Sequence, residues 1–342
     1  PDIIREELIG YTIVFDYLKQ HNEFKKCNYF NHGTQEQSDD FFETVIYLFL
    51  NDILERYYLL NTDKKDNKEL LTSIYIPLEN YIYAELLNFD IAVPILFTKF
   101  NFDEFSINEN VIIRKISDDY NKARISIRSY SPPVTISLIA SASHELVLKN
   151  YSSKRPKKFV ENLFSEESIY PHDKLEIFFN ALKICNNINT GYGQVIIYPH
   201  NWVERYKIDL PFVTGTSVKR YPNWFDNYYW NVKELPCINK EQIEDVKGVY
   251  LYFLTNQDNK LKIASKRLRY SYLRDNEEDS ILDILIALET LLGDGDKGEI
   301  TYKLSLRIAK LLDLYTDEYN PIDVFASIKK IYAFRDSAFG FD

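Results

Sequence analysis

The stretch that decides the fold reads DSILDILIALETLL, residues 279–292, and Gly293 follows it. Its apolar residues recur every three or four positions, which is the period of a helix with one buried face. Asp279 or Ser280 can cap the start of such a helix, and glycine commonly ends one. The stretch therefore predicts a helix whose apolar stripe packs against other helices.

Three more helices are predicted on either side of this one. A helix precedes it over about 261–275, and another follows over about 300–314 with its apolar residues on one face. Asn320 is placed to cap a last helix, with Pro321 at the first helical position. From about residue 245 onward, the chain is therefore expected to be helical.

The residues before about 245 combine stretches with the helical period and stretches typical of strands. The expected fold class is α+β, with an N-terminal mixed domain over 1–245 and an all-α helical bundle over 246–342, and 342 residues suit two domains. Helices are predicted from Ser38, at 69–87 (there a helix, or a helix leading into a strand) and at 172–187. Strands are predicted at 91–97, 111–116, 124–129, 134–138 and 195–198. Pro94 favours an edge strand for the first of these, 149–158 is expected to be a loop, and Gly191-Tyr192-Gly193 a turn.

Composition limits the classes of function. The net charge of −10 argues against a nucleic-acid binder that works through bulk charge, but a local basic patch remains compatible with it. The most apolar run, residues 45–60, is interrupted by charged side chains, so no membrane span is expected. The three cysteines are far apart in the sequence, and no pair has the spacing of metal ligands. Their odd number does not suggest a set of disulfides, so we expect the protein to reside in a reducing cytoplasm.

Aromatic residues cluster around Trp202, Trp224 and Trp230, with many tyrosines between Tyr198 and Tyr229. Such density suits core packing, or a surface on which nucleic-acid bases stack. Core packing is the interpretation we favour.

Arg335 follows the apolar stripe of the last predicted helix and lies on the same face. A buried guanidinium needs a carboxylate or a bound anion, because an isolated buried charge is strongly destabilising. Arg307 is in the same situation between Leu304 and Leu311, and Glu289 borders the apolar side of the 279–292 helix. Two interpretations stay open: an Arg–Glu ion pair that ties helices together, or a phosphate site lined by Arg335.

The C-terminal motifs carry a family resemblance. The pattern R-x4-R-x4-D-x3-D-x2-IALE begins at Arg269 and continues with Arg274, Asp279 and Asp283. KLSLRIA at 303–309 and IKKIYAFR at 328–335 follow it. Together these segments resemble the ApeA-like HEPN family, well over about 261–342 and vaguely over 90–200.

That resemblance implies a metal-independent endoribonuclease without cofactors, of the kind found in anti-phage (abortive infection) and toxin systems. It implies an active-site motif of Arg, a polar residue, three more residues and His, often followed by Gly, which assigns Arg335 and Asp336. Glu289, Arg307, Asp283, Arg274 and Gly340 are the supporting or phosphate-site candidates. The implied partners are RNA (such as tRNA or mRNA), a second copy of the chain in a homodimer or larger homo-oligomer, and a phage-derived trigger sensed by the N-terminal domain.

The chain departs from the motif at its histidine. Gly340 stands where the histidine is expected, and none of the five histidines lies in the helical part. Three interpretations are open: a histidine is missing between Phe339 and Gly340, the nuclease was deliberately inactivated, or the protein is a natural non-catalytic HEPN module. A non-catalytic module would bind RNA, a nucleotide or a protein partner, or would serve dimerisation alone.

Overall fold

The computed structural model divides into two compact units, which are described separately. Unit 1 contains residues 1–172 and 192–219, and unit 2 contains residues 173–191 and 220–342. Within them, the structure describes residues 9–21, 39–63, 65–127, 136–154, 171–207, 209–222, 224–228, 234–256, 258–293 and 299–339. The boundary expected near residue 245 falls inside helix α10 (Lys240–Thr255).

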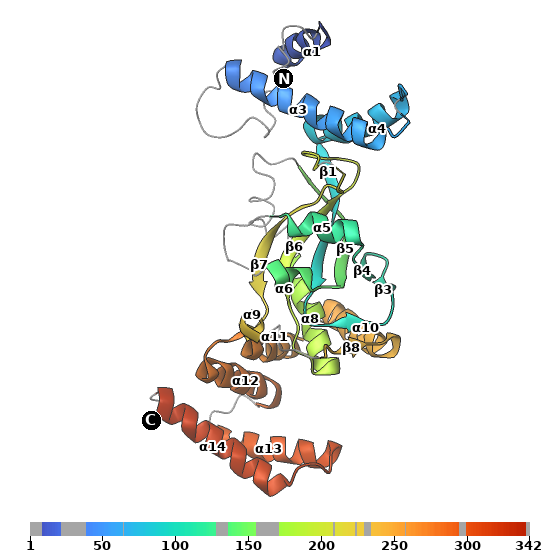
Figure 1. The fold of residues 1–342 in the computed structure, drawn as a ribbon. Coiled ribbons are helices and arrows are strands. Elements are labelled where there is room, and N and C mark those ends of the chain that lie inside the picture. Colours follow the sequence, from blue (N-terminus) through green and yellow to red (C-terminus); the bar gives the residue numbers. More distant parts are fainter. Residues whose placement is uncertain are drawn as a thin grey trace. The chain divides into compact units, whose positions relative to one another are not determined.

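Unit 1 is built on a six-stranded sheet with the order β3-β4-β5-β1-β6-β7 (Figure 1). The pairs β3–β4, β4–β5, β5–β1 and β1–β6 are antiparallel. The strands are β1 (Leu86–Ile95), β3 (Glu104–Asn108), β4 (Val111–Lys115), β5 (His144–Lys154), β6 (Tyr192–Pro199) and β7 (Thr214–Arg220). A short strand, β2 (Lys99–Phe100), follows β1 in the chain. Together with the helices of unit 2, this sheet confirms the α+β fold class.

The edge position expected for the strand around Pro94 is wrong, because β1 lies inside the sheet between β5 and β6. Pro94 is opposite Glu145 of β5, while the pairing with β6 covers only Phe89–Ala92. The proline therefore lies past the end of the β6 pairing, where its missing N–H breaks no bond on that side.

The described parts of two predicted strands contain helix instead of strand. Arg124 and Ile125 belong to α5 (Asp118–Ile125), which Ser117 caps by accepting from the Tyr120 amide. Residues 136–138, predicted as a strand, lie in α6 (Ile136–Ala140). The apolar runs misled the prediction because short buried helices and strands have similar composition. Residues 128–135 lie outside the described part.

Two further local predictions are also wrong. Residues 149–154, expected in a loop, continue β5, whereas 155–158 lie outside the described residues. Tyr192 and Gly193, expected in a turn, begin β6. A Cβ on Gly191 would come within 2.2 Å of the Arg220 carbonyl oxygen, so close backbone approach explains this glycine.

The N-terminal helices of unit 1 are α1 (Ile9–Gln20), α3 (Asp39–Leu60) and α4 (Lys68–Tyr83). The helix predicted after Ser38 is confirmed as α3, and the helix-then-strand alternative for 69–87 is confirmed by α4 and β1. Asn67 caps α4 by accepting from the Leu70 amide at 3.0 Å. On one face of the sheet, α5 buries Ala123 against residues of four strands, including Ile112, Val147 and Ile196.

Unit 2 is mainly helical, as expected. Its helices are α8 (His172–Asn186), α9 (Trp224–Tyr228), α10 (Lys240–Thr255), α11 (Asn259–Leu273), α12 (Glu277–Leu292), α13 (Ile300–Tyr315) and α14 (Pro321–Phe339), and β8 (Cys237–Ile238) is a short strand. The predicted helices at 172–187, 261–275, 279–292, 300–314 and after Asn320 are thereby confirmed.

The helix ends agree with the sequence signals, with one exception. Asn320 accepts from the Ile322 amide at 2.9 Å, and the Gly293 amide donates to the Glu289 carbonyl at the end of α12. The cap expected at Asp279 or Ser280 is wrong, because Asn276 caps α12 and accepts from the Glu278 amide. The earlier start places three acidic residues in the first turn, where the helix dipole favours them.

Candidate functional site

The candidate site lies where α12 and α14 meet. Arg335 Nη1 is 2.9 Å from Glu289 Oε1, and the Tyr332 hydroxyl donates to the same oxygen at 3.1 Å. The Arg335 guanidinium also lies 4.7 Å from the centre of the Tyr332 ring, within cation–π distance. The side chains of Arg335 and Glu289 are 19% and 29% exposed, so the pair is partly buried and still reached by solvent.

An apolar core beneath this pair fixes its geometry. Leu285 of α12, Leu304 of α13 and Tyr332 of α14 are buried together. Tyr332 is fully buried although its hydroxyl reaches Glu289, so its ring belongs to the core and its oxygen to the site. The helix stripes predicted from the sequence therefore bring Glu289 and Arg335 together. The hydroxyl of Tyr332 is a site group that the stripe alone did not reveal.

Asp283 and Arg274, two of the phosphate-site candidates, pair with each other. Asp283 is 2% exposed, and its two oxygens accept from Arg274 Nε and Arg267 Nη1, each at 2.7 Å. Asp283 raises the pKa of Arg274 by hydrogen bonding and charge. This arrangement ties α12 to the middle of α11 and to the residue that follows its last turn. The sequence did not single out Arg267, which lies in α11 seven residues before Arg274, the C-cap of that helix.

Arg307 contacts the end of a helix. Its Nη1 donates to the carbonyl oxygen of Leu292, in the last turn of α12. Helix C-termini present carbonyls without helical partners and a negative dipole end, both of which attract a cation. This contact gives Arg307 a structural role at the α12–α13 connection.

The two remaining candidates are incompletely described. Asp336 lies in α14 directly after Arg335, but its side chain is outside the described part. Gly340 lies outside the described residues altogether. The structure therefore brings together Arg335 and Glu289 from the predicted set, and separately Arg274 and Asp283.

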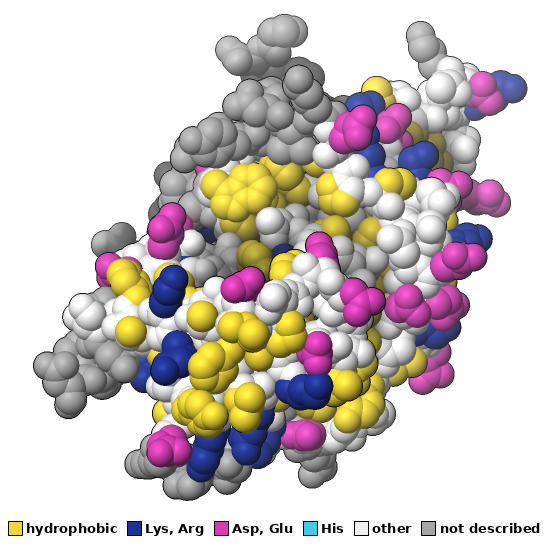
Figure 2. All heavy atoms as spheres, turned by 90° about the horizontal axis from the view of Figure 1, so that it is seen from below, with side chains coloured by type: hydrophobic (Ala, Val, Ile, Leu, Met, Phe, Trp, Pro, Cys, Tyr) yellow, Lys and Arg dark blue, Asp and Glu magenta, His cyan; other side chains and the backbone are white. Residues whose placement is uncertain are grey.

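The helices α13 and α14 contain more basic than acidic residues. They contain six basic and three acidic residues, whereas the whole chain has a net charge of −10. Figure 2 shows Lys and Arg side chains beside hydrophobic ones at this end of the molecule. The large hydrophobic residues exposed from Tyr302 onward are Tyr302, Leu306, Leu311, Leu314, Tyr315, Tyr319, Ile322, Ile331 and Phe334.

The aromatic cluster between residues 198 and 229 is mainly core. Tyr198, Trp202, Tyr206, Tyr221 and Phe225 are all buried. Trp224 is 41% exposed, and Trp230 lies outside the described residues. Core packing therefore accounts for most of this cluster.

The described residues show neither a metal-ligand cluster nor a membrane-spanning helix. They contain no group of three or more His, Cys, Asp or Glu side chains arranged to hold a metal ion. None of their helices is both long and apolar enough to span a membrane.

Comparison with models of protein families, with curated proteins and with solved structures finds no match. The resemblance to the ApeA-like HEPN family therefore stays a prediction. It rests on the motifs at 269–289, 303–309 and 328–335.

Proposed function

We propose that the C-terminal helices form a HEPN-type module that acts on RNA, with Arg335 as its phosphate-binding residue. The observation that carries the proposal is the position of Arg335, ordered by Glu289 and Tyr332 yet 19% exposed. A guanidinium held in this way can exchange one carboxylate oxygen for the oxygens of a phosphate, which it binds in bidentate geometry.

The charge around Arg335 supports RNA as the ligand. Lys329 and Lys330 are exposed on the same helix, and the basic excess of α13 and α14 contrasts with the acidic chain. Local positive charge attracts the phosphate backbone even when the net charge of a protein is negative.

The exposed apolar residues of α13 and α14 support a homodimer. Leu314, Tyr315 and Ile322 are between 67% and 84% exposed, and large apolar patches of this kind mark interfaces between proteins. The resemblance implies that two motifs meet across a dimer. We therefore propose that a second copy of this chain covers this surface, in a cytoplasmic anti-phage defence protein.

The chemistry proposed for the site depends on a histidine. Arginine stabilises the charge that develops on the phosphate, and a histidine moves the proton when the RNA 2′-OH attacks. The chain as it stands has Arg335 and Asp336 but Gly340 at the position of the histidine. RNA binding is therefore the activity we propose for this chain, and RNA cleavage for the chain with a histidine between Phe339 and Gly340.

Binding can be tested with fluorescently labelled tRNA and an unstructured RNA of equal length, by anisotropy at two salt concentrations. We expect salt-dependent binding, weakened about tenfold by Arg335→Ala. Arg205→Ala is the matched control, because Arg205 also holds a carboxylate, Asp52 at 2.8 Å, but lies in unit 1. Equal RNA affinity of the Arg335→Ala variant and the unsubstituted chain contradicts the proposal.

A non-catalytic function of the same site is the second candidate, and the missing histidine favours it. It predicts that RNA binding depends on Arg335 while cleavage stays absent after the histidine is inserted. The cleavage assay that closes the Discussion separates the two candidates.

A further inference from the structure

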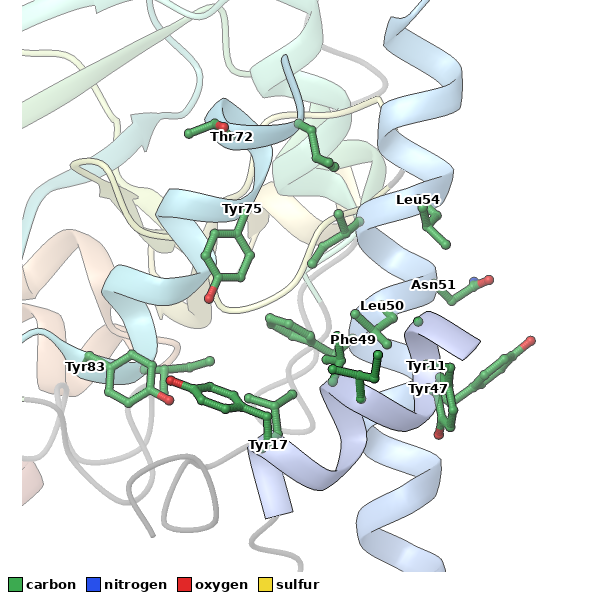
Figure 3. Close-up of a pocket in the computed structure, with 17 residues that line it drawn as sticks. Tyr11, Tyr17, Tyr47, Phe49, Leu50, Asn51, Leu54, Thr72, Tyr75 and Tyr83 are labelled. Atoms are coloured by element: carbon green, nitrogen blue, oxygen red, sulfur yellow. The ribbon is translucent and has the colours of Figure 1, made fainter. Parts of the chain in front are cut away.

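The N-terminal helices line a large, open apolar pocket that the proposed RNA site does not use. It has a volume of about 940 Å³, and the described residues that line it all belong to α1, α3 and α4 of unit 1 (Figure 3). Pockets of roughly 300–1,000 Å³ with apolar walls and a few polar groups are typical of small-molecule sites.

The apolar walls come from all three helices. Ile13 and Val14 of α1, Leu50 and Leu54 of α3, and Leu71 of α4 all line the pocket. Leu54 is 48% exposed and Ile13 66%, so ligand atoms that cover them would remove much apolar surface from water.

Three tyrosine side chains supply polar groups on one side of the pocket. Figure 3 shows Tyr17 of α1 and Tyr75 and Tyr83 of α4 gathered there. The Tyr75 hydroxyl donates to Glu79 Oε1 at 3.2 Å. Burial, the charge of Glu79 and the nearby Tyr83 and Tyr17 raise the pKa of Tyr75 to about 12, so it stays protonated at neutral pH.

The charge of the surrounding helices selects among ligands. Together α1, α3 and α4 contain eight acidic and three basic residues, and Glu79 adjoins the tyrosine side. A carboxylate and tyrosine oxygens favour a cation, and aromatic ring faces attract one as well. The Glu79 carboxylate would repel the head of a fatty acid or of another anionic amphiphile.

We propose that this pocket binds a small amphiphile with an apolar body and a cationic head. The body lies along α1 and α3, against Val14, Leu50 and Leu54. The head lies beside Tyr17, Tyr75 and Tyr83, where the carboxylate of Glu79 balances its charge. This site is independent of Arg335 and of the proposed action on RNA.

Three probes with the same ten-carbon chain test the site: decyltrimethylammonium, decanol and decanoate. Each is titrated into the full chain below its micelle-forming concentration and followed by calorimetry. We expect decyltrimethylammonium to bind most tightly and decanoate most weakly. Glu79→Gln should weaken binding of the cation about fivefold and leave decanol unchanged, because only the cation uses the charge. Glu69→Gln, on the same helix but remote from the tyrosine side, is the matched control.

A second pair of variants tests the location. Leu54→Asn should weaken all three probes, whereas Leu59→Asn should change none, because Leu59 is equally exposed on α3 but does not line the pocket. Both leucines are half exposed, so both variants should fold. Decanoate binding as tightly as the cation, no saturable binding of any probe, or binding indifferent to Leu54→Asn overturns the proposal.

Discussion

Arg335 and Tyr332 share a single acceptor, because the guanidinium and the hydroxyl both donate to Glu289 Oε1, at 2.9 and 3.1 Å. The sharing makes Glu289 the competitor of any phosphate that approaches Arg335. Its carboxylate holds the guanidinium in place and also neutralises part of its charge. The strength of RNA binding should therefore depend on Glu289 as well as on Arg335.

We predict that Glu289→Gln raises RNA affinity about two- to fivefold, because the amide keeps an acceptor oxygen but removes the charge that competes with phosphate. The ion pair is partly exposed, so its loss should cost only about 0.5–1 kcal/mol of stability. RNA anisotropy and urea unfolding measure the two effects. A lower RNA affinity of the Gln variant would show that Glu289 is needed for binding and contradict the competition.

Asp283 should contribute far more to the stability of the protein than to RNA binding. It is almost fully buried and holds Arg267 and Arg274, so Asp283→Asn leaves two arginines without their carboxylate. We expect Asp283→Asn to lower the free energy of unfolding, measured in urea, by about 2–4 kcal/mol. Asp313→Asn, which affects only an exposed pair with Lys310, should cost less than about 0.5 kcal/mol. Similar losses for both variants argue against this role of Asp283.

Arg124 is fully buried in unit 1, where it donates to the carbonyls of Ile139 and Ala142 and to Gln194 Oε1. Lysine cannot reproduce this fork of donors, and burial already lowers the pKa of Arg124 to about 10. We predict that Arg124→Lys destabilises the protein by about 2–4 kcal/mol, measured by urea unfolding. Lys122→Arg, the reverse exchange at an exposed site on the same helix, should have little effect.

His144 should make stability depend on pH. Burial lowers its pKa below the usual 6.5, although its Nε2 lies 2.7 Å from the Phe102 carbonyl oxygen. The unfolded chain therefore binds the proton more readily, so this contribution to stability is complete above pH 6.5 and is lost as the pH falls through the lowered pKa. Between pH 7 and pH 5, the free energy of unfolding measured in urea should fall more for the unsubstituted protein than for His144→Gln. Equal losses would falsify this assignment.

Sequence reasoning succeeded where local signals were complete. The stripes of α12 to α14 and the caps at Asn320 and Gly293 follow from residues within a few positions of each other. The same stripes predicted that Glu289 and Arg335 face the interior of the helical part. An ion pair between them was therefore one of the two interpretations, beside a phosphate site. In the helical part, local periodicity determines most of the packing.

The failures concern features that depend on distant residues. Pro94 is tolerated in a central strand because the pairing of β1 with β6 ends at Ala92. The β6 residues that decide this lie about a hundred residues further along the chain. Arg124 can be buried because carbonyls around residue 140 and the Gln194 side chain accept hydrogen bonds from its guanidinium. Neither partner can be identified from the residues around Pro94 or Arg124 alone.

The most direct test of the account is RNA cleavage by the chain with a histidine inserted between Phe339 and Gly340. The protein is incubated with total tRNA and mRNA in EDTA, beside the same chain with Arg335→Ala and the chain without the insertion. We predict cleavage by the histidine-containing chain alone. Intact RNA in all three reactions contradicts a HEPN-type nuclease site at Arg335, as does cleavage that persists in the Arg335→Ala variant.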